Sequence, residues 1–444
     1  MDYTPQQPSA TPLNQGNTKG HLSRIFVGSK AIWAIMLVLM SISLWIVFSA
    51  TSTKAFSSWA NGGSFFNMFG KHIISMLMAI VLCIGLSHMP LKYLRQYAFV
   101  ILLISIIPLI YVVFRGQELN GATRQMSIFG ISFQPSELVR LTLINYVASR
   151  LRLKEGMYDS VGNFWLIFGF TFLVCGIIFL DNISTAMILG GVVFYLSYIG
   201  GANRKCMNNL FLSVVGGITV MALAVMLIPA LRTGEKARLG TGHARIERFV
   251  SQVGHPINTD TFDDISGKDL QVVSSQRAIA NSHFFGVGFG KSEMRNLLPE
   301  PYSDFVFSII IEEGGIPIAC IVVLTYLLLF FAVGGIARRT NSVYYTLLSL
   351  GIGLIITLQA ILHMLICVNL FPITGQNLPL ISRGGSSYLV TGAYFGILLA
   401  VSKTNQENAD KRIANTAGNS VVMPEAIPEM PIEANIDHET NITE

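Results

Sequence analysis

The sequence predicts an all-α polytopic membrane protein of about ten transmembrane helices. Of its 444 residues, 52% are hydrophobic and only 12% are charged, whereas soluble domains carry about 25% charged residues. Apolar runs long enough to cross the ~30 Å hydrocarbon layer recur along the chain. The net charge of +5 is spread over many short loops, so no nucleic-acid partner is expected.

Ten segments are expected to cross the membrane. Nine apolar runs centre on 31–50, 72–90, 97–114, 162–180, 185–201, 208–230, 306–336, 343–370 and 386–402. The tenth, 136–151, is more amphipathic and contains Glu137 and Arg140, so it should face protein and not lipid. An even number of spans places both termini on the same side.

The positions of Lys and Arg predict the orientation. They recur in alternate connections at Lys92/Arg95, Arg150/Arg152/Lys154, Arg204/Lys205 and Arg338/Arg339, and in both tails. Because basic residues mark cytoplasmic loops, both termini are expected in the cytoplasm. The domain plan is a cytoplasmic tail (1–30), a membrane domain (31–402) and a disordered cytoplasmic C-terminal tail (403–444). A large extracytoplasmic loop, 231–304, joins helices 7 and 8.

The cysteine and histidine pattern predicts no metal site. The five cysteines lie in apolar runs or beside the basic turn at Arg204, so no disulfide framework is expected. No CxxC or Cys/His spacing typical of zinc is present.

Polar residues at membrane depth are costly and therefore candidates for function. In FQPSELVRL, Pro135 suits the first turn of a helix, and Ser136 or Gln134 can cap it. Glu137 and Arg140 are three residues apart and can pair on one helix face. They are interpreted either as a structural ion pair in a capped helix or as part of a site.

The large loop contains two further candidate features. Arg245 and Arg248 share a face if helical, a spacing suited to phosphate oxygens, although a solvated amphipathic surface explains them as well. Gly286, Gly288 and Gly290 form GVGFG, which resembles a phosphate loop only superficially, because no strand precedes it and no GK[ST] follows at the right spacing. A re-entrant or interfacial turn is expected there.

Asp304 lies where the large loop meets the eighth span. A carboxylate at the mouth of a membrane cavity is suited to act as a general base, but Ser303 or Asp304 would also serve as a helix N-cap. Glu312 and Glu313 lie deeper in the same span. At least one of them should point into a polar interior, where a cation such as Arg140 can pair with it.

The last outer loop, NLFPITGQNLPLISRGGSSYL, is expected to be irregular. Such backbone is tolerated at membrane depth only inside protein or along a cavity. The residues that oppose regular helix are Pro372, Gly375, Pro379, Gly384 and Gly385. The hydrogen-bond donors beside the final span are Ser382, Arg383, Ser386 and Ser387.

Three motifs in this order, FQPSE, LPEPYSDFVFSIIIEEGG and PITGQNLPLISRGGSS, resemble the SEDS family of FtsW and RodA. The resemblance runs from about residue 31 to 402. It implies a peptidoglycan glycosyltransferase that polymerises lipid II onto a nascent glycan by inverting transfer, releasing undecaprenyl pyrophosphate. The GQNLPLISRGG form is more similar to the division-type members than to the elongation type.

The resemblance also implies roles for individual residues. Asp304 matches the family's essential carboxylate and is expected to be catalytic. The substrate-binding set is expected to be Arg245, Arg248, Glu137, Arg140, Gln134, Ser136, Glu300, Ser386 and Ser387. The structural motif positions are Pro135, Gly286, Gly288, Gly290, Pro299, Glu312, Glu313, Thr374, Gly375, Pro379, Gly384 and Gly385. The chain departs from the family pattern at Asn182 (commonly Asp), Arg140 (commonly Lys) and His363 (often Asn).

The implied partners are a class B penicillin-binding protein, other divisome proteins and membrane lipid. The implied location is the bacterial cytoplasmic membrane at the septum, with the active site outside the cytoplasm. Mg²⁺ or Mn²⁺ remains open as a cofactor. A lipid II flippase, a RodA-like elongation polymerase and a non-catalytic scaffold remain alternatives.

Overall fold

The protein is described by a computed structural model. It describes residues 25–60, 67–115, 117–119, 122–128, 131–151, 161–180, 182–227, 268–293, 295 and 303–419.

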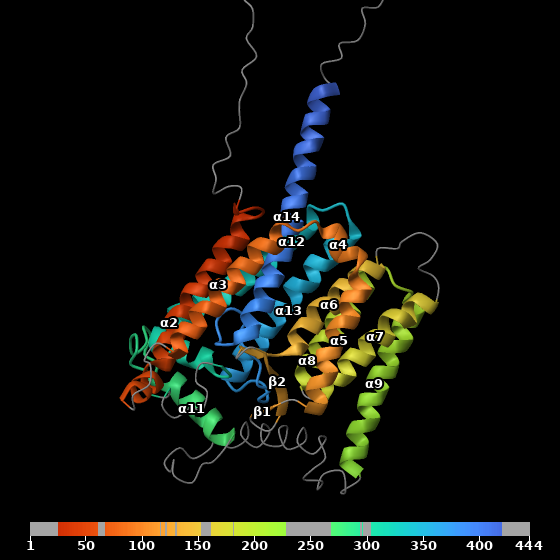
Figure 1. Ribbon diagram of the computed structural model, residues 1–444. Helices are drawn as coiled ribbons and strands as arrows, with labels where there is room; N and C mark the ends of the chain where they lie inside the picture. Colours follow the sequence, from red (N-terminus) through yellow and green to blue (C-terminus); the bar gives the residue numbers. More distant parts are fainter. Residues whose placement is uncertain are drawn as a thin grey trace, which may run out of the picture.

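Ten long helices form the body of the described protein (Figure 1). They are α2 (Lys30–Ala60), α3 (Asn67–His88), α5 (Ala98–Arg115), α6 (Pro135–Leu151), α7 (Val161–Phe179), α8 (Ile183–Ile199), α9 (Arg204–Leu227), α12 (Val306–Arg338), α13 (Val343–Cys367) and α14 (Gly385–Asn419). Each coincides with one expected span. Six contain stretches long and apolar enough to cross a membrane, and α5 and α8 are shorter apolar helices.

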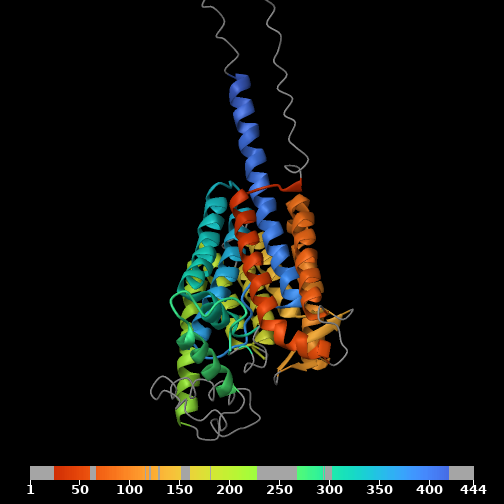
Figure 2. The same ribbon diagram turned by 90° about the vertical axis from the view of Figure 1, so that its left-hand side faces the viewer.

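The helices run side by side in one bundle, which Figure 2 shows from a second direction. The start of α2 and the C-terminal end of α14 lie at one end of the bundle (Figure 1). The short helix α11 (Lys268–Asn281) lies at the opposite end, with a small sheet. α11 belongs to the predicted large loop, so this described part of the loop lies opposite the termini.

The small sheet was not expected, because the sequence predicted helices only. Strands β1 (Gln117–Leu119), β2 (Ala122–Ile128) and β3 (Ile131–Phe133) form an antiparallel sheet in the order β1-β2-β3. In the second pairing Met126 lies opposite Phe133. β3 leads directly into α6, so the sheet fixes where that helix starts.

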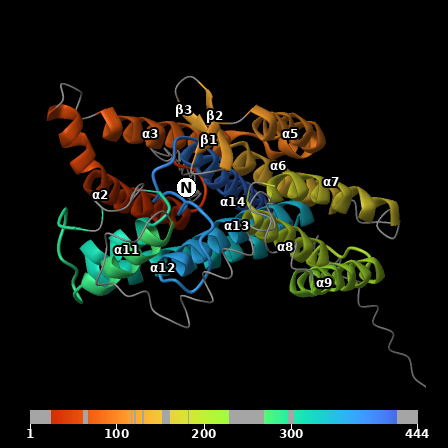
Figure 3. The ribbon, with the colours of Figure 1, turned by 90° about the horizontal axis from the view of Figure 1, so that it is seen from below.

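The polar helix α6 lies inside the bundle, as expected. Fourteen of its 17 residues are buried, and it packs between α5, α13 and α8. It begins at Pro135, in agreement with the predicted role of that proline. Viewed along the bundle axis (Figure 3), α6, α13 and α14 occupy the interior. The apolar windows of α13 and α14 are 72% and 89% buried.

α14 packs closely against α3 through two glycines one helical turn apart. A Cβ on Gly392 would lie 2.5 Å from the carbonyl oxygen of Ala79, and one on Gly396 would lie 2.8 Å from that of Cys83. Small residues four apart allow the backbones of membrane helices to approach each other. This contact places the start of α14, and therefore the loop before it, against the rest of the bundle.

α12 is broken near its start, where a single uninterrupted span was expected. Gly315 has φ 68° and ψ −170° inside the helix. The glycine loop, residues 282–293, supplies hydrogen bonds at the break. The amides of Val287 and Gly288 donate to the carbonyls of Glu312 (2.8 Å) and Glu313 (3.1 Å), and the amide of Ile316 donates to Phe284 (3.1 Å). The GVGFG sequence is thus a turn docked on a helix break.

We expect Gly286→Ala and Gly315→Ala each to destabilise the protein by at least about 1–3 kcal/mol. Both glycines have positive φ, and a Cβ on Gly286 would collide with the Glu313 carbonyl oxygen. Thermal unfolding of the detergent-purified protein measures the effect. Gly85→Ala in α3 is the matched control, because its Cβ would meet nothing within 4 Å. An equal melting temperature for Gly286→Ala and Gly85→Ala would contradict the docking.

Candidate active site

Asp304 lies partly exposed just before α12, at the end of the bundle opposite the termini. The hydroxyl of Ser303 lies 3.1 Å from Asp304 Oδ1 and 3.1 Å from the side-chain oxygen of Asn377. A serine hydroxyl has one hydrogen, so both contacts are satisfied together when the Asn377 amide turns to donate. Ser382 Oγ donates to the Ser303 carbonyl at 2.9 Å. The last outer loop thereby fixes the backbone beside Asp304.

The N-cap interpretation of Ser303 and Asp304 is wrong. The N-cap residue of α12 is Phe305, and it makes no side-chain cap hydrogen bond. Neither Ser303 nor Asp304 occupies the N-cap position.

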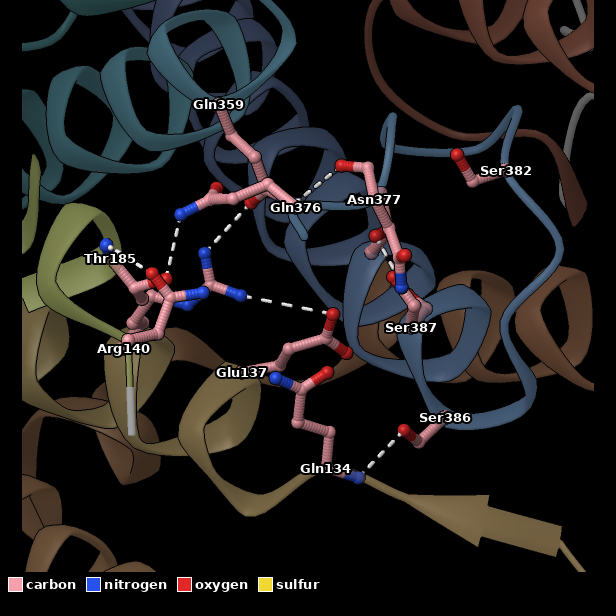
Figure 4. A network of polar contacts seen from close by, with 12 residues as sticks. Gln134, Glu137, Arg140, Thr185, Gln359, Gln376, Asn377, Ser382, Ser386 and Ser387 are labelled. Carbon is pink, nitrogen blue, oxygen red and sulfur yellow. Dashed lines mark hydrogen bonds and ion pairs between the residues drawn. The ribbon is translucent and has the colours of Figure 1, made fainter. Parts of the chain in front are cut away.

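A buried ion pair lies next to this region. Arg140 Nη2 is 3.8 Å from Glu137 Oε1, and the two side chains are only 7% and 5% exposed. Arg140 Nη1 donates to Gln359 Oε1 at 2.8 Å, and Gln359 Nε2 donates to the Asn377 carbonyl at 2.9 Å. Figure 4 shows this network. A continuous series of polar contacts thus joins Glu137 to Asn377, whose side chain meets the partner of Asp304.

The loop before α14 crosses these residues as irregular backbone, as expected. Gly375 and Leu380 have positive φ, 62° and 60°. The carbonyl of Pro379 accepts a hydrogen bond from the buried Tyr326 hydroxyl. Gly385 was expected to oppose regular helix, and this expectation is wrong, because Gly385 is the first residue of α14. Gly384 precedes it.

The serines after the glycines contact the start of α6. Ser386 Oγ accepts a hydrogen bond from the Gln134 amide at 2.9 Å, and Ser387 faces Glu137 (Figure 4). Ser136 is buried at the same helix start. The FQPSE and GGSS motifs, 252 residues apart at this bond, therefore meet in one place.

Asn182 and His363, two residues that depart from the family pattern, form hydrogen bonds with the loop before α14. Asn182 is the N-cap of α8, where its side chain accepts from the Thr185 amide and donates to the Thr374 carbonyl, both at 3.2 Å. His363 Nδ1 lies 2.6 Å from the Gln376 carbonyl. Gln376 Nε2 donates to Thr185 Oγ1 at 2.7 Å (Figure 4). Asn182 and His363 therefore both hold the loop by hydrogen bonds.

Glu312 and Glu313 do not pair with Arg140, contrary to prediction. Glu313 accepts a hydrogen bond from Ser49 of α2, and Glu312 accepts one from Ser292 of the glycine loop. The partner of Arg140 is Glu137, which lies one turn away on the same helix. Both glutamates instead belong to the junction between α2, α12 and the glycine loop.

Four predicted site residues lie outside the described residues: Arg245, Arg248, Pro299 and Glu300. Gln359, Asn377 and Gln376 were not singled out from the sequence. The signal for Gln359 was an amide inside an otherwise apolar run, ITLQAIL.

The described residues do not form a site for a resident metal ion. No group of three or more His, Cys, Asp or Glu side chains among them is placed to hold one.

The comparisons with known proteins agree on one family. The model of the FtsW, RodA and SpoVE proteins, described as cell cycle protein, matches residues 29–407. Probable peptidoglycan glycosyltransferase FtsW of Bacillus subtilis (strain 168) is 30% identical over 393 residues, 86% of this chain and 92% of the relative. The protein of the same name from Nitrosomonas europaea is 27% identical over 379 residues, 84% and 92% of the two chains.

Solved structures show the same fold. A chain from a peptidoglycan synthase complex superposes with a TM-score of 0.66 at 20% identity, covering 85% of this chain and 98% of that one. Rod shape determining protein RodA of Thermus thermophilus gives a TM-score of 0.58 at 20% identity, covering 85% and 97%.

The fold and the site define a multi-pass helical membrane protein with a polar site at the end of the bundle away from its termini. The chain belongs to the FtsW, RodA and SpoVE family of cell-cycle proteins, the SEDS family. The resemblance found in the sequence is confirmed, and the relatives described above share the FtsW name.

Proposed function

We propose that this protein is a peptidoglycan glycosyltransferase that polymerises lipid II into glycan strands during cell division. The observation that supports it most directly is Asp304, a partly exposed carboxylate that accepts a hydrogen bond from Ser303 where α12 begins. The Ser303 hydroxyl also contacts the Asn377 side chain. FtsW relatives that match over 84–86% of this chain are named probable peptidoglycan glycosyltransferases.

In the proposed reaction, Asp304 accepts the proton of the 4-hydroxyl of an incoming lipid II sugar. The resulting nucleophilic oxygen forms a bond to the anomeric carbon of the growing glycan, with inversion. The bond from that carbon to the pyrophosphate oxygen breaks, and undecaprenyl pyrophosphate leaves with the electron pair. Because pyrophosphate is a good leaving group, the reaction needs no second carboxylic acid.

We propose that Arg245 and Arg248 of the large loop neutralise the negative charge that develops on the leaving pyrophosphate. Mg²⁺ or Mn²⁺, if the reaction uses one, belongs to the substrate pyrophosphate in this proposal, and no step depends on it. Glu137 and Arg140 are too buried to grip a large lipid substrate directly. Their hydrogen-bonded connection to Asn377 favours a positioning role for the pair.

A lipid II flippase is the second candidate, and one observation favours it. α12 is broken at Gly315, and discontinuous helices line the substrate sites of many transporters. The glycine loop, however, occupies the break and satisfies its backbone groups. The break is therefore filled by protein in this structure, which favours the enzyme.

The proposed setting is the bacterial cytoplasmic membrane at the division septum, with both termini cytoplasmic and Asp304 outside. The proposed partner is a class B penicillin-binding protein, together with other divisome proteins. A structural neighbour is a chain of a peptidoglycan synthase complex in which polymerisation and crosslinking are coordinated. That likeness supports the partner class.

The test is glycan polymerisation from purified lipid II by the detergent-purified protein, alone and with a candidate transpeptidase partner. The enzyme proposal expects long glycan products that a muramidase digests. A parallel assay measures lipid II movement across proteoliposome membranes. Movement without polymer, from folded protein with its partner present, would reject the enzyme in favour of the flippase.

A further inference from the structure

A cavity lies at the end of the bundle where the termini emerge, away from the Asp304 site. Its volume is about 830 Å³, within the range of small-molecule sites. Its walls come from α4 (Leu91–Gln96), the start of α5, the end of α6 and α7. Figure 1 places α4 at the end of the bundle opposite the sheet and α11. The proposed reaction uses none of these residues.

One wall of the cavity is cationic. Lys92 and Arg95 come from α4 and Arg150 comes from α6, and no acidic side chain is among the described residues that line the cavity. Three cations around one opening favour an anion, and a phosphate group accepts several such hydrogen bonds.

The cationic wall is held in place by buried and partly buried hydrogen bonds. Asn145 Nδ2 donates to the carbonyl of Leu94 in α4 at 2.9 Å, and Tyr344 Oη donates to Asn145 Oδ1 at 2.6 Å. Arg150 Nη2 donates to Asn163 Oδ1 of α7 at 2.7 Å. A short helix of six residues is thereby hydrogen-bonded to α6 through its backbone, and it places Lys92 and Arg95 at the cavity.

The other wall is apolar and reaches the outer surface of the bundle. The rings of Phe99, Tyr146 and Phe170 contact one another with centroids 5.4–5.9 Å apart. Phe99 is 44% exposed and Leu166 is 46% exposed, on helices that otherwise present apolar residues to lipid. A ligand in this cavity would meet cations at one end and membrane hydrocarbon at the other.

We propose that this cavity is a binding site for an anionic phospholipid of the leaflet nearest the termini. Its phosphate contacts Lys92, Arg95 and Arg150, and its acyl chains lie against Phe99 and Leu166. Basic pockets between transmembrane helices on the cytoplasmic side are suited to such headgroups. A soluble phosphate shares the headgroup chemistry but gains nothing from the apolar wall.

Native mass spectrometry of the full-length protein tests this site by titration with phosphatidylglycerol, phosphatidylcholine or inorganic phosphate. The variant K92Q/R95Q/R150Q is expected to bind phosphatidylglycerol on the order of 100-fold more weakly. The matched control K205Q/R338Q/R339Q removes three charges that do not line the cavity and should bind within about twofold of wild type. Phosphatidylcholine binding should not change in either variant.

A second variant separates loss of the site from loss of the fold. K92R/R95K/R150K keeps all three charges and is expected to restore phosphatidylglycerol binding. Equal weakening by the cavity and control variants would overturn the proposal, because a general surface attraction would then explain binding. Displacement of phosphatidylglycerol by an equal concentration of inorganic phosphate would overturn it too, since the ligand would then be a soluble anion.

Discussion

Replacing Asp304 by asparagine is expected to slow glycan polymerisation by about 100- to 10,000-fold, the usual contribution of a general base. Asparagine keeps the shape and an oxygen that can accept the hydrogen bond from Ser303, but it cannot accept the proton of the attacking hydroxyl. The initial rate of polymer formation from lipid II measures the loss. Asp304→Ala should be similarly inactive.

Asp410→Asn supplies the matched control, because it makes the same chemical change at an exposed carboxylate near the end of α14. Its rate should equal that of wild type. Ser303→Ala should be intermediate, since it removes one hydrogen bond to Asp304 and leaves the carboxylate. If Asp304→Asn polymerised lipid II at the wild-type rate, another group would have to be the base.

Replacing Arg140 by methionine is expected to destabilise the protein by about 3–5 kcal/mol, because it leaves the Glu137 carboxylate buried without its cation. It also removes the donor to Gln359 Oε1. The double variant Glu137→Gln/Arg140→Met should recover much of this loss, since no unpaired charge then remains buried. Thermal unfolding in detergent compares the three proteins.

An exposed ion pair on α14, Lys403 with Glu407, serves as the comparison for the buried pair of Glu137 and Arg140. Lys403 Nζ lies 3.9 Å from Glu407 Oε1, with the two side chains 32% and 56% exposed. Lys403→Met should therefore cost less than about 1 kcal/mol. Identical melting temperatures for Arg140→Met and the double variant would show that Glu137 and Arg140 are not coupled.

The sequence was sufficient to predict the ten long helices, because bilayer thickness sets their length and basic turns separate them. It also placed the polar span α6 inside the bundle, since Glu137 and Arg140 exclude a lipid-facing position. The family resemblance placed residues of the FQPSE and GGSS motifs in one substrate-binding set. Neither motif alone shows that the Gln134 amide would reach Ser386.

The partners of the buried charges could not be predicted from spacing alone. Arg140 was open to either Glu137 or the pair Glu312 and Glu313, and only the packing of α2 and the glycine loop against α12 decides between them. The break in α12 at Gly315 could not be predicted from the sequence either. A glycine within an apolar run continues as helix unless another segment supplies hydrogen bonds at that point.

The break in α12 has a mechanical consequence. The piece from Val306 to Gly314 is joined to the long remainder of the helix through the non-helical Gly315, while its last carbonyls hydrogen-bond the glycine loop. A displacement of that loop must therefore either break two backbone hydrogen bonds or carry the short piece with it. Asp304 lies two residues before this piece. The glycine loop thus couples any force applied to it to the position of the carboxylate, independently of the part of α12 that follows Gly315.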